Sequence, residues 1–195
     1  MAVVALLVAV DLGSKSWVMP WLESGMMRYQ HLIEGAAEPP ALVRDDHGHE
    51  RYPIAGQWLG LMHNLNYGAA FGKMSGIPWL LVVGRCIAAL VLMFLIARAP
   101  RGAPFYLTAL VLILAGALGN LWDNFTYTPL EPEDGRPFGP VRDFIDVYFT
   151  RWDWHFPTFN IADSCITVGA ILLLLSGFGG GGENAGDPAD AVEAA

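Results

Sequence analysis

Four long runs of apolar residues dominate the sequence, and two long polar segments and one short one separate them. The runs cover residues 2–22, 79–97, 105–122 and 160–178. Each holds about 18 to 21 residues, which as a helix is roughly 27 to 31 Å long and matches the hydrocarbon core of a bilayer. We therefore predict an all-α membrane protein with four transmembrane helices, in which residues 1–178 form one membrane-embedded domain.

The composition supports this prediction. Of the 195 residues, 54% are hydrophobic and 15% are charged, whereas average proteins carry about 25% charged residues. Aromatic residues lie near the ends of the runs, where amphipathic rings favour the membrane interface; they are Trp17, Trp21, Trp79, Tyr106 and Trp122. The net charge of −8 and the lack of a basic patch argue against nucleic acid as a partner.

The connecting segments predict an orientation. Residues 98–104 form a short loop with Arg98 and Arg101 and no acidic residue, whereas the segments 23–78 and 123–159 are long. An excess of Lys and Arg marks cytoplasmic loops. We therefore expect the short loop and both chain termini in the cytoplasm and both long loops outside.

The outer loops differ in character. Residues 54–72 are rich in Trp, Leu and Met and favour short strands on the bilayer surface, which predicts a small β-rich extracytoplasmic cap. Residues 34–53 are interpreted as a solvated insertion, and the Pro- and Gly-containing segment 126–140 as a loop. Residues 141–156 hold six aromatic residues and are expected to rest in the headgroup layer. The Gly-, Ala- and acid-rich tail 179–195 is predicted to be disordered in the cytoplasm.

Polar residues interrupt the apolar runs in three places. They form pairs three or four residues apart: Asp11 with Lys15, Asn120 with Asp123, and Asn160 with Asp163. Such residues are costly in a membrane and are usually functional. The second and third pairs lie at the outer ends of successive helices, so they should converge at one leaflet, and Asp143 lies between them in the sequence and can fold back to the same surface.

Convergent carboxylates suggest a chemistry. Two carboxylates brought close together share one proton, because ionising both is unfavourable. One can then act as a general base on water while the other donates a proton to a scissile carbonyl oxygen. This is aspartyl protease chemistry, which requires no metal and no cofactor.

Five short motifs resemble, in order, those of lipoprotein signal peptidase, also called signal peptidase II. They are DLGSK (11–15), NYGAAFG (66–72), GALGNLWD (116–123), VRDFID (141–146) and FNIADS (159–164). The resemblance implies a four-helix membrane bundle with a β-rich cap. It also implies an enzyme of the bacterial inner membrane that removes the signal peptide from prolipoproteins, cutting before a diacylglyceryl-modified cysteine. Its partners would be these substrates and membrane lipids.

The resemblance also assigns roles to residues. Asp143 and Asp163 match the catalytic pair, and the other matching residues are supporting or substrate-binding; they are Asp11, Lys15, Asn66, Gly68, Asn120, Asp123 and Asn160. Two roles stay open for the pair Asp11 and Lys15, which could be a buried ion pair that fixes helix packing or could contact substrate. Gly68 could serve packing or the close approach of an extended substrate.

The chain departs from the family pattern beside the third helix. The family places Arg directly after the aspartate that ends this helix, whereas this chain has Asn124. The family usually has an apolar residue directly before the aspartate of its DFI motif. In this chain that aspartate is Asp143, and Arg142 precedes it. We hypothesise that Arg142 replaces the lost charge and points toward Asp123; the alternative is that it faces water or a lipid phosphate.

The sequence also allows two other interpretations. A non-catalytic membrane binding protein or a proton-coupled carrier could use the same scaffold, since carriers also hold intramembrane acids. Carrier sites favour the midplane and inverted repeats, whereas these acids gather at one leaflet. His47 and His49 suggest a metal site, but they lack the spacing of a helical ligand pair and are interpreted as part of a solvated loop, so no metal is predicted.

Overall fold

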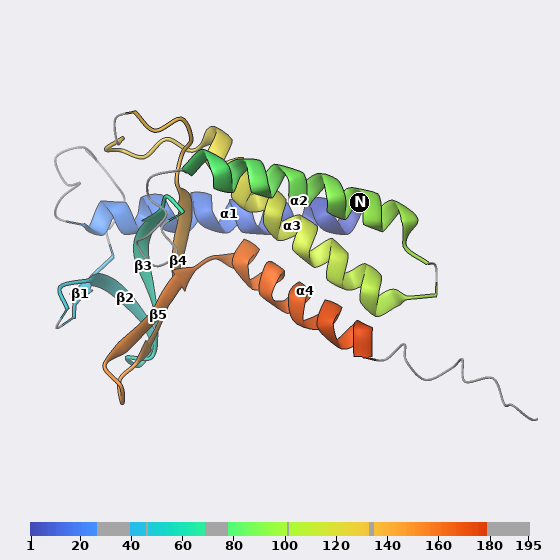
Figure 1. Cartoon of the computed structure of the whole chain (residues 1–195). Helices are drawn as coiled ribbons and strands as arrows, with labels where there is room; N and C mark the ends of the chain where they lie inside the picture. The colour runs from blue at the N-terminus through green and yellow to red at the C-terminus, as the bar shows by residue number, and fades with distance from the viewer. Residues whose placement is uncertain (27–39, 46, 69–77, 101, 133–134, 179–195) are drawn as a thin grey trace, which may run out of the picture.

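The computed structural model describes residues 1–26, 40–45, 47–68, 78–100, 102–132 and 135–178. Within these residues, four helices form a bundle and five strands form one antiparallel sheet at one end of it (Figure 1). The helices are α1 (Ala2–Gly25), α2 (Pro78–Arg98), α3 (Pro104–Thr126) and α4 (Ile161–Phe178). The strands are β1 (Val43–Arg44), β2 (Glu50–Ala55), β3 (Leu59–Asn66), β4 (Val141–Phe149) and β5 (Trp154–Phe159). The predicted tail 179–195 and motif residues 69–72 lie outside this description.

Helix α3 is the centre of the bundle. Its Leu110 and Leu114 are fully buried in a core that includes Val4 of α1 and Val82 of α2. Helix α3 packs closely against α4 at Gly116. A Cβ added to this glycine would collide with the carbonyl oxygen of Ala162. Small residues allow two helix backbones to approach in this way in membrane proteins.

The predicted membrane spans are confirmed in part. Helices α1, α2 and α3 are each long and apolar enough to cross a membrane. Helix α4 is apolar but shorter, so its crossing stays a prediction. Helices α1 and α3 continue beyond the predicted ends at residues 22 and 122, because the polar residues there have partners inside the protein; Glu23, for example, is buried and contacts His63 at 3.1 Å.

The sheet is larger than predicted. Strand β3 confirms the expectation of short strands in residues 54–72. Strand β1 and most of β2 instead lie in residues 34–53, which were interpreted as a solvated insertion. The stretch 141–156 forms β4 and the first part of β5, which pair as a hairpin, and its place in the headgroup layer stays a prediction. Strand β4 pairs with β3 on one side and with β5 on the other, so its backbone groups are satisfied by the sheet.

The sheet is fixed to the bundle through Phe144 of β4. This ring is buried in a cluster with Val18, Met19 and Leu22 of α1. Because neighbouring side chains on a strand point to opposite faces, packing Phe144 also fixes where Asp143 points. The first residues of α1 and the last of α4 lie at the end of the bundle away from the sheet (Figure 1).

Candidate active site

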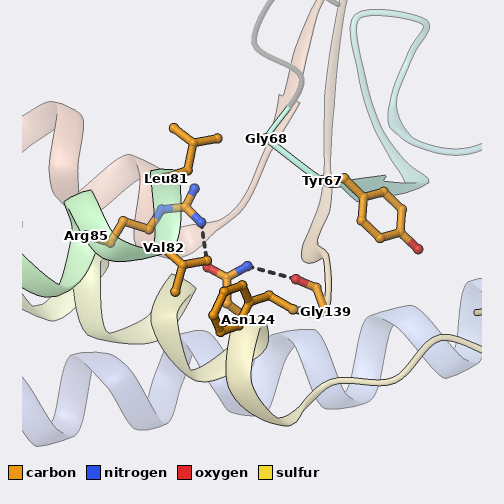
Figure 2. A pocket seen from close by; sticks show the side chains of 8 residues that line it. Tyr67, Gly68, Leu81, Val82, Arg85, Asn124 and Gly139 are labelled. Atoms are coloured by element: carbon orange, nitrogen blue, oxygen red, sulfur yellow. Dashed lines mark hydrogen bonds between the residues drawn. The ribbon is translucent and has the colours of Figure 1, made fainter. Parts of the chain in front are cut away.

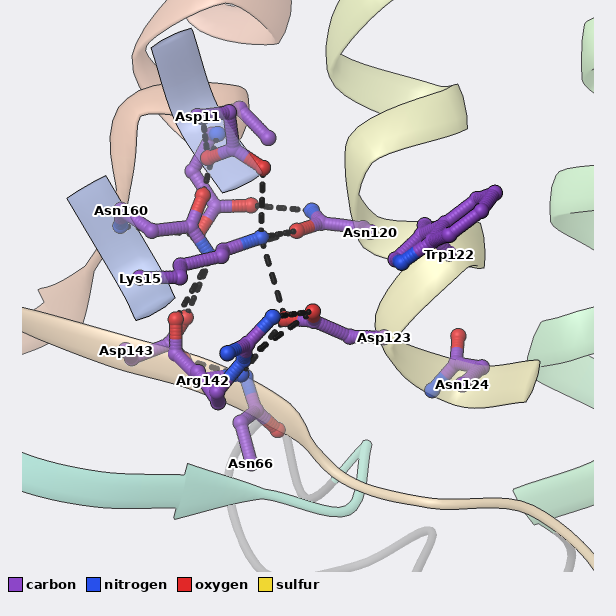
Figure 3. Close-up of polar contacts among 12 residues, drawn as sticks. Asp11, Lys15, Asn66, Asn120, Trp122, Asp123, Asn124, Arg142, Asp143 and Asn160 are labelled. Atoms are coloured by element: carbon purple, nitrogen blue, oxygen red, sulfur yellow. Dashed lines mark hydrogen bonds and ion pairs between the residues drawn. The ribbon is translucent and has the colours of Figure 1, made fainter. Parts of the chain in front are cut away.

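Lys15 lies at the centre of a buried polar network between α1 and α3 (Figure 3). Its Nζ is 2.8 Å from Asp11 Oδ2, 3.1 Å from Asn120 Oδ1 and 3.1 Å from Asp123 Oδ2. The Lys15 side chain is fully buried. An ammonium group has three N–H donors, so these three acceptors match its capacity. This favours the buried ion pair over direct substrate contact for Asp11 and Lys15.

Asp11 also ties α1 to α4. Its Oδ1 accepts a hydrogen bond of 2.9 Å from the backbone N–H of Ala162, in the first turn of α4. The first N–H groups of a helix have no partner inside the helix and favour a negative charge. Gly119 of α3 leaves the space for this carboxylate, because a Cβ there would lie 2.5 Å from Asp11 Oδ2.

Asn160 and Asp163 form a reciprocal cap at the start of α4. The Asn160 Oδ1 accepts from the Asp163 N–H at 2.9 Å, and the Asn160 N–H donates to Asp163 Oδ2 at 3.3 Å. This is the arrangement of a capping box. The other oxygen, Asp163 Oδ1, accepts from Asn120 Nδ2 at 2.8 Å. Hydrogen bonds to both oxygens, one from the cap and one from Asn120, therefore fix the position of the Asp163 carboxylate.

Asp143 of β4 is buried beside this cap. Its Oδ1 accepts from Asn160 Nδ2 at 2.7 Å and its Oδ2 accepts from Asn66 Nδ2 at 3.0 Å. Burial, and after it the negative charge of Asp163, raises the pKa of Asp143 to about 7. A carboxyl group with such a pKa can hold a proton at neutral pH.

Asn66 and Gly68 form the turn that follows β3. The Asn66 Oδ1 accepts a 2.8 Å hydrogen bond from the Gly68 N–H, while its amide reaches Asp143. Gly68 has a φ of +90°, and an added Cβ would collide with Leu81. The positive φ therefore favours glycine at this position, and a larger residue would also have to displace the Leu81 side chain. This gives Gly68 a structural role and orients Asn66 toward Asp143.

Arg142 points toward Asp123, as hypothesised from the sequence. Its Nη2 and Nε lie 2.6 and 3.1 Å from Asp123 Oδ1, and its backbone N–H donates to Oδ2 at 3.0 Å (Figure 3). Both Arg142 and Asp123 are buried. Asp123 therefore contacts two cations, Lys15 and Arg142, and the idea that Arg142 compensates for Asn124 stays a hypothesis.

Arg85 of α2 lies beside the site and was not predicted from the sequence. Its Nη1 donates to Asn124 Oδ1 at 2.7 Å, and Asn124 Nδ2 donates to the Gly139 carbonyl at 2.8 Å (Figure 2). Arg85 and Asn124 line a small pocket with Tyr67 and Gly68. The sequence did hold one indication of this role: Arg85 is a charged residue within the apolar run 79–97. Burying a charge in a membrane is energetically unfavourable, so such residues usually have a function.

All nine residues predicted for the site belong to one continuous network. The contacts run from Asp11 through Lys15 to Asn120 and Asp123, and from Asn120 through Asp163 and Asn160 to Asp143, Asn66 and Gly68. The network lies where the sheet meets the ends of α3 and α4. Fold and site thus define a membrane protein with buried acids at one end of its helix bundle.

The model of the signal peptidase (SPase) II family matches residues 3–178, so the chain belongs to this family. The lipoprotein signal peptidase of Acinetobacter baylyi is 43% identical over 122 residues, which cover 60% of either chain. That of Paraburkholderia phytofirmans is 43% identical over 114 residues. The aligned regions span 60% and 58% of the lengths of these two relatives.

A longer alignment joins the chain to the lipoprotein signal peptidase of Photorhabdus laumondii, with 34% identity over 151 residues, or 75% of this chain and 82% of the relative. A solved bacterial membrane enzyme, determined by the in meso method at 2.3 Å, has the same fold. Its TM-score is 0.65 at 22% identity, and the match covers 95% of this chain and 91% of that one.

Proposed function

We propose that this protein is an aspartyl endopeptidase that removes the signal peptide from prolipoproteins, cutting before a cysteine that carries a diacylglyceryl group. The observation that carries the proposal is the environment of Asp143. It is a buried carboxyl group with a pKa raised to about 7 by burial and by the neighbouring Asp163. Family membership supports the substrate class.

The hydrogen-bond partners distinguish this pair from the other buried acids. Asp143 accepts hydrogen bonds from the neutral amides of Asn66 and Asn160, and Asp163 accepts from Asn120. Asp11 and Asp123 instead contact cations. Among the contacts of the described residues, the carboxylates of Asp143 and Asp163 thus bond to amides, whereas those of Asp11 and Asp123 are engaged in ion pairs. This difference supports Asp143 and Asp163 as the pair that transfers protons.

The reaction follows from one shared proton. The ionised carboxylate of the pair takes a proton from water as the water oxygen bonds to the scissile carbonyl carbon, and the protonated partner gives its proton to the carbonyl oxygen. The resulting diol collapses when the C–N bond breaks. A diol proton returns to the pair, and the proton taken from water passes to the leaving amine. Asp143 and Asp163 then again hold one proton.

The position of the pair fits cleavage at a membrane surface. We propose four transmembrane spans in the bacterial inner membrane, with both termini cytoplasmic and the sheet outside at the outer leaflet. Trp122 and Phe125, at the site end of α3, are more than half exposed, which suits contact with lipid or acyl chains. A carrier would place its acids near the midplane, whereas these lie where helices meet the sheet.

The direct test is an assay of the purified full chain in detergent on a synthetic prolipoprotein peptide with a diacylglyceryl-cysteine. Mass spectrometry should find one cut, on the amino side of the lipidated cysteine. Intact peptide after long incubation with folded protein would contradict the proposal. Cleavage at another bond would overturn the assigned specificity.

A further inference from the structure

A second cluster of polar side chains lies in the sheet, separate from the site just described. Asp45 follows β1, His49 precedes β2, and His155 belongs to β5. Although β1 and β5 are the outer strands of the sheet, Asp45 Oδ2 lies 3.0 Å from His155 Nε2. The sheet therefore curls, so that its two edges meet at these side chains.

The three side chains point their ligand atoms at one place. Asp45 Oδ2 is also 3.1 Å from His49 Nδ1, and the three ligand atoms all lie within 4.8 Å of one another. Around a tetrahedral Zn²⁺ with bonds of about 2.0 to 2.1 Å, ligand atoms are about 3.3 Å apart. The two distances from Asp45 Oδ2 are thus close to the spacing that such an ion needs.

Both ring nitrogens of His155 face carboxylates. Its Nδ1 lies 2.7 Å from Asp146 Oδ1, and its Nε2 lies 3.0 Å from Asp45 Oδ2. Although it lies near Asp45, the buried Nε2 has no hydrogen-bond partner among the described residues. A metal ion beside Asp45 would take this Nε2 and the carboxylate oxygen as ligands, while Asp146 keeps its contact with Nδ1.

The surroundings have the form of a metal site. A carboxylate on the far nitrogen of a ligating histidine orients the ring and raises its basicity, as Asp146 does for His155. Asp146 is in turn held by Arg51 at 2.5 Å. The side chains of Asp45 and His155 are 11% and 12% exposed, whereas that of His49 is 46% exposed and leaves a route for an ion.

We propose that Asp45, His49 and His155 bind one divalent transition-metal ion of the Zn²⁺ type, with water in the fourth position. Two imidazoles and one carboxylate suit Zn²⁺ better than Mg²⁺ or Ca²⁺, which prefer oxygen ligands. The ion would clip the segment between β1 and β2 to the β4–β5 hairpin. It is a structural site, and it does not depend on the proposed peptidase activity.

This proposal revises the interpretation of His49 as part of a solvated loop. Spacing along the sequence could not reveal the site, because His155 lies 106 residues after His49 and joins it only through the curl of the sheet. His47 lies nearby, with its Nε2 2.9 Å from Asp153, and is not needed as a ligand.

The test is a zinc titration of the full chain, purified in detergent and stripped with EDTA, by isothermal calorimetry and by competition with a chromogenic chelator. We expect one Zn²⁺ per chain, and affinity about tenfold or more weaker in His49→Ala and in His155→Ala. Zinc should also raise the melting temperature of the wild type more than that of His49→Ala, whereas Mg²⁺ should raise neither.

The matched control is His63→Ala, which removes a histidine outside the cluster and should keep the zinc affinity. His49 is half exposed, so His49→Ala should fold and decides the question even if His155→Ala does not. Equal zinc affinity in the wild type and His49→Ala, or no zinc binding by the wild type, would overturn the proposal. Because the readouts are binding and melting, either result is independent of whether the chain cleaves peptides.

Discussion

The side-chain amide of Asn160 donates a 2.7 Å hydrogen bond to Asp143, while the side-chain oxygen of the same Asn160 accepts from the backbone N–H of Asp163. One asparagine therefore joins the two acids of the proposed pair, one on strand β4 and the other on helix α4. The relative position of the acids depends on a helix cap as well as on the sheet.

Asn160→Ala should accordingly lower activity and stability together. Loss of the cap should cost about 1 kcal/mol of unfolding free energy. The lost hydrogen bond to Asp143 lowers the pKa of that group in the wild type, so its removal should raise this pKa further and move the alkaline limb of the pH–rate profile to higher pH. Ser164→Ala, which removes a hydroxyl contact to the Asn160 carbonyl, is the control. An unchanged profile in Asn160→Ala would exclude the link.

The pH dependence of activity should reflect the shared proton. Because the pKa of Asp143 is raised to about 7, the pair should lose its proton, and the enzyme its activity, as pH rises through about 7.

The raised pKa of Asp143 should also make the stability of the protein depend on pH. The folded state binds the Asp143 proton more tightly than the unfolded state, so this stabilisation is complete below about pH 4 and is lost as pH rises through about 7. Asp143→Asn should remove this contribution in thermal melts recorded across that window, and identical melts for both proteins would contradict it.

Arg142→Ala should destabilise the protein by about 3 kcal/mol, because it removes one partner from a buried ion pair with Asp123. Adding Asn124→Arg should restore much of the loss if position 124 can supply the same charge. The inserted side chain would lie beside Arg85, so rescue should be fuller when Arg85→Gln removes the like charge. Wild-type melting of Arg142→Ala, or no gain in the double variant, would show that compensation is absent.

The substrate should need its lipid. Each buried CH₂ of an acyl chain adds about 0.8 kcal/mol to membrane affinity, and the site lies beside exposed aromatic residues of α3. Peptides with and without the diacylglyceryl group, otherwise identical, should therefore differ strongly in kcat/KM. Equal kcat/KM values for the two peptides would contradict a requirement for the lipid.

Much of the site was predictable because helical spacing is local. Asp11 and Lys15 lie one turn apart, so their pairing follows from the sequence once the helix is predicted. The catalytic role of Asp143 depended on a family resemblance, and β4, which positions it, was not predicted as a strand. The side chains on both faces of β4 are largely buried. The alternation of apolar and polar residues that marks a half-exposed strand is therefore missing from its sequence.

Contacts that depend on tertiary folding were not predictable from spacing. Arg85 reaches Asn124 only because α2 packs beside α3, and His155 reaches His49 only because the sheet curls. The sequence nevertheless holds an indication of both Arg85 and His49. Arg85 is a charge in an apolar run, and His49 lies in a segment rich in acids and histidines.

The rates at which Asp143→Asn and Asp163→Asn cleave a lipidated prolipoprotein peptide test whether the two acids act as the catalytic pair. Each variant should keep its fold, checked by thermal unfolding, and lose at least about 10²-fold in kcat, because Asn keeps the size of the side chain and cannot take part in the proton transfer. Asp153→Asn, a change of the same type at an exposed acid outside the network, should cut at the wild-type rate. Wild-type turnover by either Asp143→Asn or Asp163→Asn would contradict the account.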